Sequence, residues 1–403
     1  MPPFLAASNL QRKMTNMLIE PFNSMTTFFF RRSVEKAFQL DEPPTGLSLN
    51  PNKPLGANPP FITSAVDDVM YIVNQIIQRS LATSQRSVIA GVVPTIGRVL
   101  GSDFVGMVQR KMRDESYPKA AIQGALPPED KVIAFLVLIN NLEVATDYIK
   151  RIVMSHVGTP TPASTDGATG PSVSLGDLFP FNHDATFVLN QLKAMEHGFE
   201  AKATELVNEA VAVTFHQVIK PRVRPILAEA FRDVEYDLSA DALAPAEPRD
   251  GADAGAPDAE PHEDAVRNRF DRGWGAIVRP IKRILAAPAF DKLLGTALAY
   301  LARALEKRVW SHYGRVSELG AVRLERDVAA VAAAAVAGGR YGLRDAFARC
   351  AQMTLVMNME QDEWEALAAA PERPEREDQA GVVWQLDASE RERARAIVKD
   401  RAG

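Results

Sequence analysis

The chain has 403 residues, of which 46% are hydrophobic, with 46 Lys and Arg against 51 Asp and Glu and a formal net charge of −5. This length is enough for two or three domains with dry cores, and the acidic balance argues against broad nucleic-acid binding. A single cysteine, Cys350, excludes an intramolecular disulfide and favours the cytosol over an oxidising compartment.

The first sixty residues predict a helix followed by a loop. Residues 1–40 are expected to form an N-terminal helical segment, because apolar residues recur at steps of three and four from Leu10 to Leu40, with a break at Pro21. The first twenty residues lack the charged-then-apolar order of a secretory signal. Residues 41–60 are rich in Pro, Gly and Asn and have no period, which predicts a loop.

Residues 61–238 are predicted to form a helical bundle. In its first helix Ser64 is expected at the N-cap, and seven apolar residues are expected to face the core: Val66, Val69, Met70, Val73, Ile76, Ile77 and Leu81. Pro94 is expected to kink or split the next helix, and Pro221 and Pro225 to stop a long one. Residues 158–176 read as a linker that cannot bury enough apolar surface to order itself.

We expect no segment of this chain to cross a membrane. The longest apolar run near the middle, Val132 to Ile139, is stopped by Asn140 and Asn141, far short of the ~20 residues that a bilayer requires. Work at a membrane would then depend on partners or on surface contact.

The last part of the chain predicts a disordered acidic linker at 239–264 and a C-terminal helical bundle at 265–402. No segment alternates over the length of a strand. The fold class expected is all-α, with elongated helical bundles of the multisubunit-tether type and disordered loops.

The histidines do not predict a catalytic or metal site. None has a second His, Cys or acid at the spacing of a zinc motif, and they are far apart in the sequence: His156, His183, His197, His216, His262 and His312. No phosphate-binding loop or nucleophile elbow is present. We therefore expect no catalytic residue, no bound metal and no cofactor.

Asp67 and Asp68 leave an enzymatic alternative open. They resemble the start of the D-D-x-x-D motif with which all-helical prenyl-transferring enzymes hold magnesium and diphosphate, but Tyr71 replaces the third acid. The simpler interpretation is two acids in the first turn of a helix, where they are favoured by the helix dipole.

A cluster of basic residues lies beside Phe270 and Trp274. It could contact anionic lipid or an acidic partner helix at ~1 kcal/mol per cation, or it could be a solvated face that shields the acidic linker. Its members are Arg267, Arg269, Arg272, Arg279, Lys282 and Arg283. Arg279 and Arg283 are the two residues that we single out as a partner surface.

Several separated strings resemble one family. They include D-D-V-x-Y-I-V at Asp67 to Val73, I-K-P-x-V-x-P-x-L at Ile219 to Leu227, and L-R-D-x-F-A-R at Leu343 to Arg349. Together they make the chain similar to the C-terminal half of subunit 4 of the conserved oligomeric Golgi complex, a helical-rod vesicle tether related to exocyst subunits. The resemblance covers none of the N-terminal coiled-coil region of that subunit, which is implied to join sister subunits and engage SNAREs, and we expect the 403 residues to lack that region.

The resemblance implies a non-catalytic subunit that acts in intra-Golgi retrograde transport from the cytoplasmic face of the Golgi membrane, held there peripherally. It implies other tether subunits, SNAREs and SNARE regulators as partners, with no nucleic acid. Arg344 in the L-R-D string and Glu390 in the closing helix match the family, and we expect them to pair and to form a surface feature that a partner reads. An unrelated helical adaptor is the remaining alternative.

Overall fold

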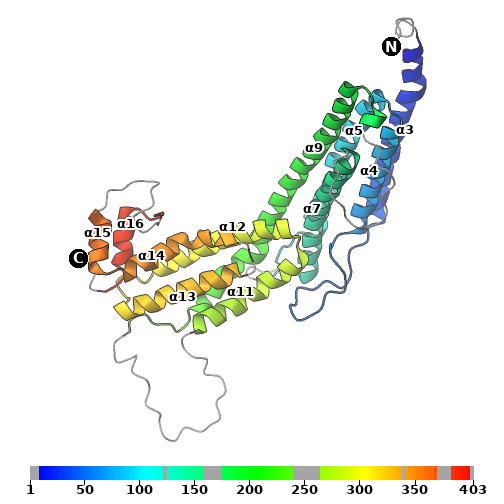
Figure 1. The fold of residues 1–403 in the computed structure, drawn as a ribbon. Helices are drawn as coiled ribbons and strands as arrows, with labels where there is room; N and C mark the ends of the chain where they lie inside the picture. The colour runs from blue at the N-terminus through cyan, green and yellow to red at the C-terminus, as the bar shows by residue number, and fades with distance from the viewer. Residues whose placement is uncertain are drawn as a thin grey trace, which may run out of the picture. The chain divides into compact units, whose positions relative to one another are not determined.

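The computed structural model describes residues 9–120, 125–157, 175–238, 264–337, 339, 341–369 and 383–399. Over these ranges the chain forms helices and no strand, apart from one isolated parallel bridge between Val316 and Val398 (Figure 1). The all-α prediction is confirmed. His262 and all but the last residues of the two predicted linkers, 158–176 and 239–264, lie outside the described residues.

The chain divides into two compact units. Unit 1 comprises residues 1–213 and 280–290, and unit 2 comprises residues 214–279 and 291–403. These two units do not test the elongated form or the domain bounds that the sequence predicts, and both stay predictions.

Unit 1 is built mainly from helices in the first half of the chain. In chain order these are α2 (Leu10–Met14), π-helix η1 (Thr15–Ile19), α3 (Glu20–Gln39), α4 (Ser64–Ala82), α5 (Arg86–Val99), π-helix η2 (Leu100–Phe104), α6 (Val105–Arg110), π-helix η3 (Lys111–Glu115), α7 (Glu129–Val157), α8 (Leu175–Leu178) and α9 (Asn182–Thr214). α3 packs on α4 and α5, and α4 packs on α7.

The core of unit 1 follows the predicted stripes. All seven apolar residues predicted to face inward on α4 are buried. The start of α4 differs by one residue from the prediction, because Thr63 is extended and occupies the N-cap while Ser64 is already helical. The Ser64 hydroxyl instead accepts a hydrogen bond from the Glu42 amide at 2.9 Å.

The prolines do not break the helices as predicted. Pro21 follows η1 in the first turn of α3, and Pro221 follows π-helix η4 (Phe215–Ile219) in the first turn of α10 (Lys220–Ala230). A proline has no N–H and its ring clashes with the carbonyl four residues back. The π-turn accommodates it: the Glu20 amide donates to Thr15, five residues back. Pro225 lies inside a helix that continues past it, and Pro94 does not split α5, whereas a kink at Pro94 stays a prediction.

Two buried asparagines on α7 fix the segments around them. Asn140 donates to the carbonyls of Phe61 (3.0 Å) and Ile284 (2.8 Å) and accepts from the Ala286 amide (2.7 Å). Asn141 exchanges two hydrogen bonds of 3.0 Å with Thr63. Backbone groups that have no helical partner are thus satisfied by side chains, which is required of buried polar groups.

Two helical runs of unit 1 are long and apolar enough to cross a membrane by length and composition alone, Arg86–Glu115 and Glu129–Val157. About half or more of the apolar window of each is buried inside the protein. The core helices of a bundle meet the same criterion, so this finding leaves the expectation of no membrane crossing as a prediction.

Unit 2 holds the remaining helices. After η4 and α10 these are α11 (Ala265–Ile284), α12 (Ala287–Trp310), α13 (Glu318–Val336), 3₁₀-helix η6 (Tyr341–Phe347), α14 (Ala348–Asn358), α15 (Gln361–Ala369) and α16 (Ala388–Arg395). α14 packs on α13 and α16. The last residues of α11 and the first of α12 belong to unit 1.

Candidate functional site

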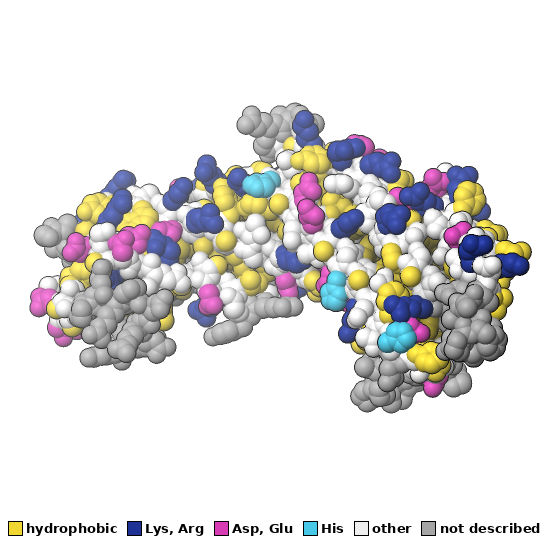
Figure 2. Space-filling model, turned by 90° about the horizontal axis from the view of Figure 1, so that it is seen from above, with side chains coloured by type: hydrophobic (Ala, Val, Ile, Leu, Met, Phe, Trp, Pro, Cys, Tyr) yellow, Lys and Arg dark blue, Asp and Glu magenta, His cyan; other side chains and the backbone are white. Residues whose placement is uncertain are grey.

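Both residues of the predicted partner surface on α11, Arg279 and Arg283, make contacts within the protein. Arg283 donates to three carbonyls of the loop before α4: Asn50 (3.4 Å), Pro51 (3.1 Å) and Lys53 (2.9 Å). Arg279 pairs with Asp271 on its own helix at 2.6 Å. On the face of the molecule that Figure 2 shows, basic, acidic and hydrophobic side chains are interspersed. Contact of the cluster with lipid stays a prediction.

Asp67 has a role that does not require a metal. Its carboxylate accepts a hydrogen bond from the Tyr148 hydroxyl at 3.0 Å, and Asp68 is exposed. Burial and the contact with Asp67 raise the pKa of Tyr148. Among the described residues no group of three His, Cys, Asp or Glu side chains could hold a metal ion.

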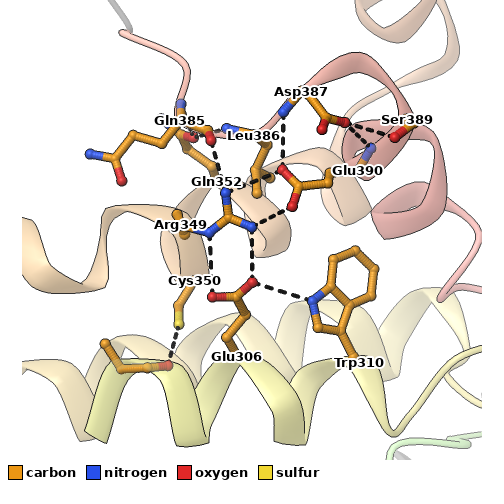
Figure 3. Close-up of polar contacts among 11 residues, drawn as sticks. Glu306, Trp310, Arg349, Cys350, Gln352, Gln385, Leu386, Asp387, Ser389 and Glu390 are labelled. Atoms are coloured by element: carbon orange, nitrogen blue, oxygen red, sulfur yellow. Dashed lines mark hydrogen bonds and ion pairs between the residues drawn. The ribbon is translucent and has the colours of Figure 1, made fainter. Parts of the chain in front are cut away.

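A dense polar cluster of unit 2 is centred on Arg349, at the start of α14 (Figure 3). Its guanidinium bridges two carboxylates from different helices. Nη2 lies 2.9 Å from Glu306 on α12 and 2.6 Å from Glu390 on α16, and Nη1 lies 3.1 Å from Glu390. Nη1 also donates to the Gln385 carbonyl at 2.9 Å. We call Glu306, Arg349 and Glu390 the terminal clasp.

Local contacts position the two ends of the terminal clasp on α16 and α14. Asp387 and Glu390 form a capping box at the start of α16: the Asp387 carboxylate accepts from the Glu390 amide at 2.7 Å, and the Glu390 carboxylate accepts from the Asp387 amide at 3.1 Å. Gln352 follows Arg349 by three residues and lies next to it (Figure 3). Its side chain donates to the Val383 carbonyl and accepts from the Gln385 amide, in the segment that leads into α16.

The charges in the terminal clasp support one another. Hydrogen bonds to Glu390 and Glu306 raise the pKa of Arg349, and the Arg349 hydrogen bond lowers the pKa of Glu390. The Arg349 side chain is about one-third exposed, which places the clasp between a surface pair and a buried one. Planar guanidinium groups suit such double recognition because their N–H donors form a fixed fork.

Tryptophans surround the same closing helix. Three arginines of α16 each lie over a tryptophan ring: Arg391 over Trp384, Arg393 over Trp310 and Arg395 over Trp364. Arg395 is nearly fully buried and also donates to the Met359 carbonyl at 2.9 Å. Cation–π contacts and the terminal clasp therefore fasten α16 from several sides.

The predicted pair of Arg344 and Glu390 is wrong in its arginine. Arg344 is exposed on η6, and Glu390 binds Arg349, five residues further along the same L-R-D-x-F-A-R string. Glu306 was not foreseen at all. A usable signal existed, because Arg349 adjoins the buried stripe of Cys350, Met353 and Met357, where an arginine needs a partner.

This arrangement can hold a chain segment but offers no evident chemistry. The carboxylates are paired with a guanidinium, and no open nucleophile lies beside them. Cys350 is buried and donates to the Ala302 carbonyl, and burial raises the pKa of its thiol to about 12, which keeps it protonated at neutral pH.

Two family models match this chain side by side. Residues 1–112 match the COG4 transport protein, middle alpha-helical bundle, and residues 135–393 match the conserved oligomeric Golgi complex subunit 4, C-terminal. The terminal clasp lies within the second match.

Curated relatives agree with these matches. The chain is 23% identical to conserved oligomeric Golgi complex subunit 4 of Arabidopsis thaliana over 83% of this chain and 39% of the relative. It is 25% identical to the Saccharomyces cerevisiae subunit over 68% and 31%, and 23% identical to the Homo sapiens subunit over 85% and 41%. The chain thus spans well under half the length of these relatives.

Proposed function

The chain belongs to the family of conserved oligomeric Golgi complex subunit 4, and from this membership we propose that it is a non-catalytic subunit of a Golgi vesicle-tethering complex. The observation that carries the proposal is the succession of two matched regions, a middle bundle and a C-terminal region, in one chain whose described part consists of helices joined by loops. Its role would be intra-Golgi retrograde transport and Golgi organisation through protein–protein contacts.

The proposed partners are the other subunits of the complex, together with SNAREs and their regulators. The proposed location is the cytoplasmic face of the Golgi membrane, to which the complex would be bound peripherally. Stacked helices suit such work because they present long surfaces whose exposed side chains can vary without disturbing the packed stripes. The terminal clasp supports the proposal by fixing the end of unit 2 as a stable surface.

Native purification of the tagged full chain from cells, followed by mass identification of its partners, tests this proposal. We expect the remaining Golgi tether subunits in the purified complex. A matched variant, Arg113→Glu, changes an exposed residue and should purify with the same partners. Partners drawn only from outside vesicle traffic would refute the proposal and favour an unrelated helical adaptor.

The enzyme alternative has a separate test. Magnesium-dependent turnover of a prenyl diphosphate, abolished by Asp67→Ala, would support it. We expect no turnover, because Asp67 is hydrogen-bonded to Tyr148 and the described residues around it supply no third acid. Location can be checked by microscopy against a Golgi marker, with protease access in permeabilised cells reporting the side of the membrane.

A further inference from the structure

The outward face of α3 carries more exposed apolar surface than the solvent-facing side of a helix normally does. Phe30, Val34, Ala37 and Phe38 are buried, and they account for the inward face. On the other side Met25, Phe28 and Phe29 are 72%, 69% and 53% exposed. Single exposed apolar residues are ordinary, but a contiguous aromatic patch usually marks an interaction site.

The exposed residues are spaced as the receiving surface of another helix. Met25, Phe28, Phe29 and Arg32 stand at i, i+3, i+4 and i+7, the four residues that surround one hole on a helix surface. Phe29, Arg32, Ser33 and Lys36 surround the next hole in the same way. These residues line an open, shallow hollow on α3.

The charge along this face changes in one direction. The first hole is apolar on three sides, whereas Arg32 and Lys36 border the second hole, and both are exposed. Arg32 and Glu35 form an ion pair in which both side chains are solvent-exposed, so the pair is weak. Lys36 forms no ion pair within the described part of the chain. Arg31 adds a further base, 3.5 Å from Asp103.

We propose that the face of α3 formed by Met25, Phe28, Phe29, Arg32 and Lys36 docks an α-helix of a partner protein that inserts an apolar side chain between the phenylalanines and places acidic residues one to two turns further along. A helix fits because it alone presents side chains at the spacing of the two holes. An acidic flank fits because it would neutralise Arg32 and Lys36, whereas a basic flank would be repelled.

This face of α3 is independent of the proposed place of the chain in a Golgi tether. The chain can co-purify with Golgi tether subunits whether or not the face docks a helix, and the face can dock a helix of a partner outside that complex.

Photo-cross-linking in cells tests the proposal on the full chain. A benzophenone amino acid replaces Phe28, whose side chain is 69% exposed and takes no part in the core, and the cross-linked peptides are mapped by mass spectrometry. The matched control carries the same cross-linker at Tyr71, another aromatic residue, 66% exposed on α4. We expect the Phe28 position to link to a helical segment of another protein that has acidic residues within about two turns.

Charge reversal supplies the second readout. Arg32→Glu combined with Lys36→Glu should lower the cross-link yield at least about fivefold, because two attractions become repulsions. Reversing the mapped acids on the partner should restore the yield, and Arg113→Glu should leave it unchanged. Links to lipid, to a second copy of the chain or to the chain itself would overturn the proposal, as would a yield no higher than at Tyr71.

Discussion

Replacing Arg349 by methionine should loosen the end of unit 2. The change keeps the unbranched apolar stem of the side chain as far as the position of Nε and removes every donor of the terminal clasp, so that Glu306 and Glu390 face each other without a cation between them. These carboxylates are only 19% and 31% exposed, so water replaces the lost contacts incompletely.

The size of the effect follows from this partial burial. Breaking an exposed ion pair costs about 0–1 kcal/mol, and breaking a buried one costs about 3–5 kcal/mol. The terminal clasp lies between these limits, so we expect a loss of about 2–3 kcal/mol in the free energy of unfolding of unit 2. For a unit of roughly 150–250 residues this lowers the melting temperature by about 4–12 °C.

Tryptophan fluorescence during thermal unfolding is the suitable assay, since three of the four tryptophans, Trp310, Trp364 and Trp384, lie against α16. Arg344→Met is the matched control and should shift the melting temperature little, because Arg344 is exposed. A melting temperature of Arg349→Met equal to that of the wild type, or an equal loss in both variants, would refute the reasoning.

Three further predictions concern other buried contacts. Asn140→Leu should destabilise unit 1 by about 2–5 kcal/mol in urea unfolding, because two buried carbonyls and one amide lose their partner; an unchanged midpoint would contradict this. Gly320→Ala should destabilise unit 2 by about 1–3 kcal/mol or more, because a Cβ there would overlap the Tyr236 carbonyl, and Gly320→Ser should be no better. Burial, with neighbouring arginines, lowers the pKa of His312, so its contribution to stability is present above a pH of about 6.5 and is lost as the pH falls through the lowered pKa. His312→Phe should flatten that part of the stability profile, and a wild-type profile in the variant would rule out this assignment.

The helices and their buried faces were predictable because their signals are local. The stripe on α4 repeats every three to four residues, and each member is buried as that spacing requires. The prolines misled the prediction for an equally local reason: a sequence pattern does not show that a π-turn precedes Pro21 and Pro221 and removes the clash.

The sequence by itself determined the fold class, the inward stripes and, through its family strings, the kind of protein to which the chain belongs. Only the tertiary structure decided which charges meet: Glu390 binds Arg349 instead of Arg344, and Arg283 binds three loop carbonyls. Helical periodicity is fixed by neighbours three and four residues apart, whereas an ion pair depends on how helices distant in the sequence pack. A shift of about one helical turn is enough to decide which of two arginines on a segment faces a given carboxylate.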